Sequence, residues 1–198
     1  MSKNRLEAFT DGVIAVLITI MVLNIRPPDG VHLSDLRPLL PKVSVYLLSF
    51  VFLGIYWNNH HHLMQAVDRI SGSVMWANLH LLFWLSLTPL AAAWMGPHLD
   101  ESAPVGVYGV VLLGSAVAFS PVLTRTLLAA NGPDSRLGRA LGNDWKANLS
   151  IAAYVVAIAV SPVVPLLSVA IYVAVAATWL VPDRRIERMI VPEANDPD

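Results

Sequence analysis

The spacing of charged residues constrains this chain more than any other feature of its sequence. No Asp, Glu, Lys or Arg occurs in five long stretches, which cover residues 12–25, 43–67, 70–99, 102–124 and 147–182. A helix that crosses a bilayer needs about 20 consecutive apolar residues. Only 14% of the 198 residues are charged and 56% are hydrophobic, whereas an ordinary soluble domain is about 25% charged. The sequence therefore predicts an all-α polytopic membrane protein.

The charge-free stretches and the turn residues between them predict six transmembrane helices. We expect these helices to cover about 6–25, 42–65, 74–95, 104–129, 144–160 and 165–180, with loops over 27–41 and 131–142. The last stretch is long for one helix and tight for two. Two prolines at its middle, Pro162 and Pro165, favour a break, since each removes a backbone donor. One kinked helix at this place, giving five spans in all, is the alternative.

The distribution of basic residues predicts which side of the membrane each loop occupies. With six spans and a cytoplasmic N-terminus, 10 of the 13 Lys and Arg residues lie inside and three lie outside, namely Arg26, Arg37 and Lys42. This bias agrees with the positive-inside rule. We therefore expect a multi-pass protein of a bacterial-type inner cell membrane with both termini in the cytoplasm. Residues 1–182 would form the membrane domain and residues 183–198 a cytoplasmic tail.

Three polar clusters are predicted to meet on the cytoplasmic side. The first helix opens with Arg5, Glu7, Thr10 and Asp11, the second ends with the run from Tyr56 to His62, and the third opens with Trp76, Asn78 and His80. Charges at the mouth of a membrane helix are costly unless paired, so they mark a function or a structural clasp. We expect Arg5 to pair with Asp11, and Asp11 or Thr10 to bond a histidine of the second helix. Trp57 and Asn78 would donate to the remaining acceptors.

Other kinds of chemistry are not expected. His60, His61 and His62 are consecutive, so on a helix their side chains point about 100° apart and cannot converge on one metal ion. The sequence has no nucleophile–base pair, no Gly-rich phosphate loop and no paired carboxylates within a span. A net charge of −1 gives no reason to expect a nucleic-acid partner. We predict neither an enzyme nor a bound cofactor or metal.

The motifs of the first three helices resemble those of a known channel family. Arg5-x-x-x-Phe9-Thr10-Asp11-Gly12 resembles the signature of the bacterial relatives of the endosomal and lysosomal potassium channel, the transmembrane protein 175 family. Trp57-x-x-His60 resembles the second-helix motif of that family, and Asn78 precedes an apolar run that ends in Pro89, as in the family. Two positions depart from the usual pattern, because Thr10 replaces a serine and Val16 stands where isoleucine is common.

The resemblance implies a homotetramer in the lipid bilayer whose central pore is lined by the first helix of each subunit. The implied pore-lining and gating residues are Val16, Thr19 and Leu23, which the spacing i, i+3, i+7 places on one helix face. Four copies would form two apolar constrictions with a threonine ring between them, and apolar rings gate by dewetting. The resemblance thus implies a leak-type cation channel, permeable to potassium among the monovalent cations. Arg5, Phe9, Thr10, Asp11, Trp57, His60 and Asn78 would form a structural polar network.

Two further functions stay open at this point. A proton channel or proton-coupled transporter would use Asp11 and the histidines of the second helix, because intramembrane acids and histidines relay protons. The sequence shows no inverted repeat, which many transporters carry. An assembly partner without transport activity is the third hypothesis.

Overall fold

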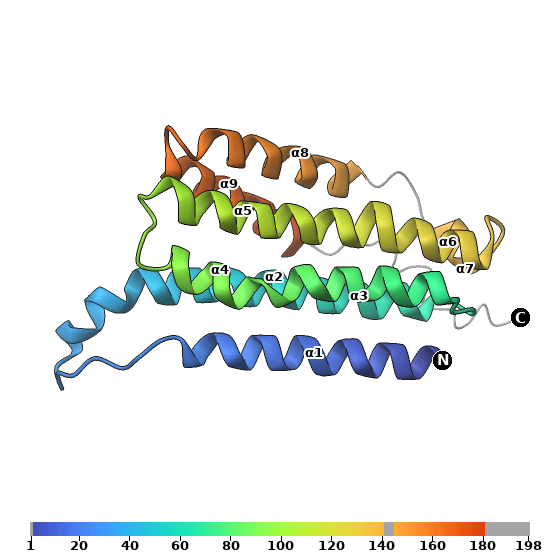
Figure 1. Cartoon of the computed structure of the whole chain (residues 1–198), viewed down its shortest axis with the longest axis horizontal. Coiled ribbons are helices and arrows are strands. Elements are labelled where there is room, and N and C mark those ends of the chain that lie inside the picture. The colour runs from blue at the N-terminus through green and yellow to red at the C-terminus, as the bar shows by residue number, and fades with distance from the viewer. Residues whose placement is uncertain (1, 141–144, 181–198) are drawn as a thin grey trace, which may run out of the picture.

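The computed structural model describes residues 2–140 and 145–180, and these form a bundle of helices (Figure 1). The elements in chain order are α1 (Lys3–Leu23), η1 (Leu33–Leu39), α2 (Leu40–Gln65), α3 (Gly72–Ser86), α4 (Thr88–Met95), α5 (Ser102–Val117), η2 (Ala118–Thr124), α6 (Arg125–Asn131), α7 (Arg136–Ala140), α8 (Trp145–Val160) and α9 (Pro165–Leu180). The all-α prediction is confirmed for these residues. The expected tail, 183–198, and the expected first residue of the fifth span, Asp144, lie outside the described residues.

Four helical stretches within the described residues are long and apolar enough to cross a membrane. They cover Lys3–Leu23, Leu33–Gln65, Gly72–Met95 and Ser102–Asn131. Two shorter apolar helices, α8 and α9, follow them. Each long stretch contains one charge-free segment or most of one, and the charged residues of these stretches, such as Arg5, Lys42 and Arg125, lie toward their ends. A charge near the middle of a span would be costly to bury in hydrocarbon.

The chain turns back on itself between α8 and α9, as the two prolines predict. Residues 161–164 form a turn, and α9 packs antiparallel along α8 (Figure 1). The Ser168 hydroxyl of α9 donates to the Ala157 carbonyl of α8 at 2.6 Å, which ties the two arms together. One continuous helix over this segment, the basis of the five-span alternative, is therefore wrong.

Two expected loops contain helical turns. Within 27–41, η1 is a 3-10 helix that leads directly into α2. The Asp35 carboxylate accepts from the backbone N–H of His32 at 2.9 Å and so stabilises the first turn of η1. Within 131–142, α7 is a short helix, and the Ser135 hydroxyl accepts from the Gly138 N–H at 3.1 Å near its start. Side-chain caps of this kind are weak signals in a sequence whose strongest pattern is apolar length.

Two expected continuous helices are interrupted next to a proline. The third span breaks at Leu87 into α3 and α4, and Pro89 lies in the first turn of α4, where its missing N–H is tolerated. The fourth span widens into the π-helix η2 around Pro121. The Thr124 hydroxyl donates to the Phe119 carbonyl at 3.1 Å and so satisfies a backbone acceptor in this wider turn.

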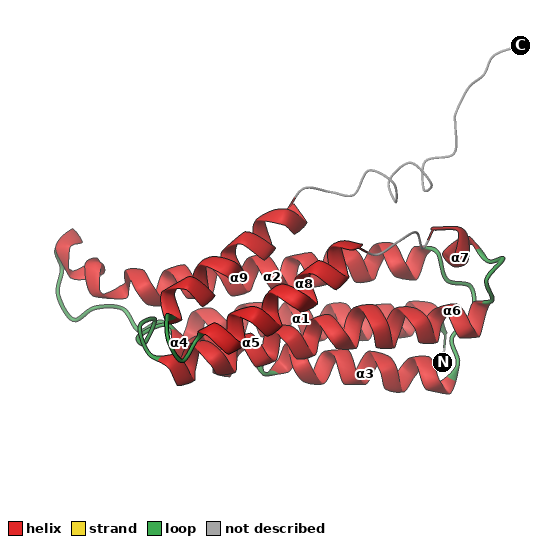
Figure 2. Ribbon diagram, turned by 90° about the horizontal axis from the view of Figure 1, so that it is seen from above, coloured by secondary structure: helices red, strands yellow, loops and turns green. Residues whose placement is uncertain are grey.

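The helix α1 occupies one edge of the bundle and packs against α2, α3 and α4 (Figure 1). The opposite edge is formed by α8 and α9 (Figure 1), and α5 lies next to them (Figures 1 and 2). Two apolar clusters fill the interior. One joins α1 and α3 to η2 and α6, and the other joins α2 and α4 to α5, α8 and α9.

Candidate functional site

The helix α1 has two distinct faces. One face is buried against the bundle and consists of Leu6, Thr10, Ile14, Leu17 and Met21. These residues recur every three or four positions, which is the period of one helix face. Another face carries Phe9, Val16, Ile20 and Leu23, which are 43–76% exposed, with Leu23 the most exposed of the four.

Val16, Thr19 and Leu23 all lie on the exposed face of α1. Val16 is 53% exposed, and Thr19 lies on the same side of the helix one turn further along. The Thr19 hydroxyl donates to the Val16 carbonyl at 2.9 Å and also lies 3.1 Å from the Ala15 carbonyl. Because its proton is directed to the backbone, the Thr19 oxygen keeps a lone pair available to an external donor or cation.

A buried chain of hydrogen bonds joins α1, α2 and α3. The Asn78 side-chain amide donates to the Thr10 hydroxyl oxygen at 2.9 Å, and the Thr10 hydroxyl donates to the Leu6 carbonyl at 3.0 Å. The Asn78 carbonyl oxygen accepts from the Nε2 atom of His60 at 2.9 Å. All three side chains are 0% exposed. A polar chain closed within an apolar interior fixes how the three helices pack, because any other register leaves its members unpaired.

A second contact between α1 and α2 lies nearby. The Nδ1 atom of His61 lies 2.8 Å from the Glu7 carboxylate, and the Gln65 amide lies 2.8 Å from Nε2 of the same ring. Trp57 is half exposed and stacks on His61 at a centroid distance of 6.3 Å. The structure therefore places Trp57 beside the Glu7–His61 pair and not in the Thr10–Asn78–His60 chain.

The remaining motif residues lie apart from that chain. Arg5 and Phe9 are exposed, and no ion pair joins Arg5 to Asp11 within the described part of the molecule. One carboxylate oxygen of Asp11 is buried without a partner, as is the Nδ1 atom of His60. Neither the expected Arg5–Asp11 pair nor a direct bond from Asp11 or Thr10 to a histidine is thus present, and Asn78 stands between Thr10 and His60.

Asn131, at the end of α6, clamps the turn between α2 and α3, which the sequence reading did not predict. Its side-chain oxygen accepts from the N–H groups of Asp68 and Arg69 at 3.1 and 2.9 Å. Its amide nitrogen donates to the carbonyls of Arg69 and Leu127 at 3.1 and 2.9 Å. The pair Asn131-Gly132 indicates the end of a helix, but it does not indicate that the Asn131 side chain contacts residues 68–69.

Replacing Asn131 by alanine is expected to loosen the turn at residues 68–69. The loss of the clamp leaves two N–H groups and one carbonyl of the turn to water, at a cost of about 1 kcal/mol. Amide hydrogen exchange of these residues should then accelerate roughly fivefold. Asn148→Ala, at an exposed asparagine of α8, is the control. Unchanged exchange in the Asn131 variant would show that the clamp does not hold the turn.

Over residues 2–140 and 145–180, no group of three or more His, Cys, Asp or Glu side chains is placed to hold a metal ion.

The family profile covers the helices that carry the polar chain, and similar proteins extend over nearly the whole sequence. The profile of the family described as "Endosomal/lysosomal potassium channel TMEM175" matches residues 5–89. A potassium channel of Chryseobacterium sp. (strain P1-3) is 46% identical over 190 residues, which cover 96% of this chain and 98% of the relative. The chain belongs to the TMEM175 family.

Other members of the TMEM175 family extend the likeness. The crystal structure of a lysosomal potassium-selective channel TMEM175 homolog from Chamaesiphon minutus superposes with a TM-score of 0.78 at 27% identity, covering 92% of this chain and 97% of that one. The mouse endosomal/lysosomal proton channel TMEM175 is 26% identical over 59% of this chain and 25% of its own length. These TMEM175 proteins are ion channels and not enzymes.

Proposed function

We propose that this protein is a leak-type, potassium-permeable cation channel that assembles as a homotetramer in the inner cell membrane. Each subunit crosses the membrane six times, through four long helical stretches and the α8–α9 hairpin. Residues 1–182 form the channel domain and residues 183–198 a cytoplasmic tail, with both termini inside. Membership of the TMEM175 family and the potassium-channel names of its bacterial relatives support this proposal.

The exposed apolar face of α1 is the observation that carries the proposed pore. Val16, Thr19 and Leu23 are exposed on α1, which lies at one edge of the bundle. Four such faces around an axis would cover one another and enclose a path for ions. At about 1.5 Å per residue, the two apolar rings stand roughly 10 Å apart. The rings of Val16 and Leu23 act as gates by dewetting, and the Thr19 oxygens replace part of the ion's hydration shell.

The buried Thr10–Asn78–His60 chain serves as the anchor of the pore helix in this proposal. It holds the N-terminal half of α1 against α2 and α3, and the Glu7–His61 contact adds a second attachment at the same end. The half that carries Leu23 has no corresponding polar attachment among the hydrogen bonds of residues 2–140 and 145–180. Opening would therefore displace the Leu23 end of α1 more than the Thr10 end.

Cation flux into proteoliposomes tests the channel. Purified protein should conduct potassium down a gradient, with valinomycin as the control for sealed vesicles, and should conduct sodium less well. Leu23→Ala should raise the flux several-fold, because the variant replaces four isobutyl groups by methyl groups at one constriction. Leu166→Ala, at an exposed leucine of α9 (59% exposed), should conduct like the wild type. Flux no greater than that of empty liposomes would contradict the proposed channel. Equal flux from the Leu23 variant and the wild type would contradict a pore lined by α1.

Proton permeation is the second candidate. The unpartnered buried atoms of Asp11 and His60 favour it, since both are proton acceptors near the attachment of α1. The mammalian relatives named as proton channels add weight. A pH-sensitive dye inside the vesicles separates the two functions: acidification that saturates, and that Asp11→Asn abolishes while potassium flux persists, would favour proton transport.

A further inference from the structure

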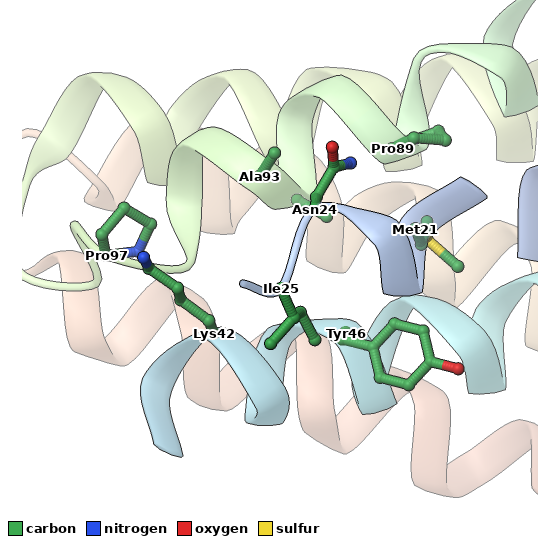
Figure 3. A pocket seen from close by; sticks show the side chains of 9 residues that line it. Met21, Asn24, Ile25, Lys42, Tyr46, Pro89, Ala93 and Pro97 are labelled. Carbon is green, nitrogen blue, oxygen red and sulfur yellow. The ribbon is translucent and has the colours of Figure 1, made fainter. Parts of the chain in front are cut away.

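A groove lies at the end of the bundle opposite to the N-terminus, between the last turn of α1, the first turns of α2 and the end of α4 (Figure 3). Its volume is about 100 Å³, which far exceeds the roughly 10–15 Å³ that one water requires. The lining residues are Met21, Asn24, Ile25, Lys42, Tyr46, Pro89, Ala92, Ala93 and Pro97. None of them belongs to the polar chain or to the exposed face of α1.

The groove changes character along its length. Lys42 extends from α2 toward Pro97 at one end, while Tyr46, Met21 and Pro89 gather at the other (Figure 3). On α2, Tyr46 lies one turn further from the end of the bundle than Lys42, and at the end of α1 the apolar Met21 lies further from it than the polar Asn24. The groove therefore has a cationic end toward the membrane surface and an apolar end toward the membrane interior.

The polar end has donors without partners. Lys42 has no ion pair or hydrogen bond, and Asn24 has no side-chain hydrogen bond, within residues 2–140 and 145–180. An ammonium offers three donors and a side-chain amide offers two, so a ligand with several acceptor oxygens and a negative charge would satisfy them. The backbone of Lys42 is held close to α4 because Gly96 has no side chain; a Cβ there would lie 3.1 Å from the Lys42 Cα.

We propose that this groove binds a single phospholipid by its headgroup end, with Lys42 as the counter-ion of the phosphate. The charged group of the lipid lies at Lys42 and near the Asn24 amide, and the first part of an acyl chain lies along Tyr46, Met21 and Pro89. A free phosphate would leave the apolar half empty, and a neutral amphiphile would leave the ammonium unpaired, so neither satisfies both ends.

The bound lipid would also hold the end of α1 in place. Asn24 and Ile25 follow directly on Leu23, so the occupied groove fixes the outer end of the helix that carries the outer apolar ring. This effect on α1 rests on the proposed pore. The lipid binding does not depend on the pore, and it can be measured without ion flux.

Thermal stability of the purified full-length protein in detergent tests the site. Three probes are added separately at constant ionic strength: dihexanoyl phosphatidylglycerol, dihexanoylglycerol without phosphate, and inorganic phosphate without a chain. Phosphatidylglycerol alone should raise the melting temperature of the wild type. Lys42→Gln should increase the concentration needed for half of this effect by about tenfold, because a charge-assisted contact is lost, whereas Lys42→Arg should retain it.

Two further variants separate the groove from general surface charge. Ala93→Leu fills the groove and leaves Lys42 intact, and since Ala93 is exposed on α4 the fold should tolerate it; this variant should also lose the response. Arg37→Gln removes an exposed cation of η1, outside the groove, and should respond like the wild type. The proposal is overturned if Lys42→Gln keeps the full response, if dihexanoylglycerol acts as well as phosphatidylglycerol, or if inorganic phosphate alone reproduces the effect.

Discussion

Replacing Asn78 by leucine should lower the melting temperature of the purified protein by roughly 4–8 °C, which corresponds to about 2 kcal/mol for a chain of this size. Asn78 is 0% exposed and bonds Thr10 of α1 and His60 of α2. The substitution removes two interhelical hydrogen bonds, worth about 0.6 kcal/mol each in membrane proteins, and leaves the N–H group of His60 unpaired in an apolar interior.

A matched control exists in the same bundle. Asn58→Leu changes an exposed asparagine of α2 and should leave the melting temperature nearly unchanged. A double-mutant cycle with His60→Leu isolates the bond itself, and a coupling of about 0.5 kcal/mol or more is expected for residues in one network. If both asparagine variants melt alike, the buried chain does not hold α1 to its neighbours.

Replacing Gly109 by alanine should destabilise the bundle by about 2 kcal/mol. A Cβ at this buried position of α5 would meet the Tyr172 hydroxyl, and it would lie 2.9 Å from Cγ1 of Ile158. Tyr172 cannot move freely, because its ring packs against Tyr108 and Tyr154 and its hydroxyl donates to the Val105 carbonyl at 3.1 Å. Overpacking costs about 1–3 kcal/mol and the displaced hydrogen bond about 1, which together outweigh the roughly 1 kcal/mol that alanine gains over glycine in a helix.

Gly54→Ala gives the opposite expectation and serves as the control. No atom lies within 4 Å of a Cβ built at Gly54 of α2, so only the helix propensity should change, and the melting temperature should stay equal or rise. Thermal unfolding followed by tryptophan fluorescence measures both variants. Equal melting of the two proteins would indicate that α5 and α9 are not in close contact at Tyr172.

The sequence predicted the helical bundle well because the bilayer leaves few choices for an apolar segment. Charge-free length fixes where a helix runs, and Pro162 with Pro165 fixes where α8 ends and α9 begins. Pro89 and Pro121 also lie within expected spans. The sequence does not reveal the neighbouring helices, and these decide whether a proline causes a break, as at Leu87, or a π-helix, as in η2.

The polar residues were predicted as a group, but the predicted pairs, Arg5 with Asp11 and Asp11 or Thr10 with a histidine, are wrong. Topology brings Thr10, His60 and Asn78 to one level of the bundle, while the choice of partner depends on helix rotation by a fraction of a turn. That rotation places Asn78 between Thr10 and His60, turns Arg5 outward and leaves Trp57 beside His61. Asn131 illustrates the same limit, because its partners at 68–69 are more than 60 residues away in the chain.

The Asn131 clamp also bears on how this protein ages chemically. An asparagine followed by glycine deamidates when the next backbone nitrogen attacks its side-chain carbonyl carbon. In the folded chain the N–H of Gly132 is bonded to the Leu128 carbonyl at 2.8 Å, and the Asn131 amide is held at both ends. An unfolded chain lacks both restraints. Deamidation would leave a carboxylate that cannot donate to the Arg69 and Leu127 carbonyls. A chain that stays unfolded for long therefore loses the clamp, whereas a folded chain protects it.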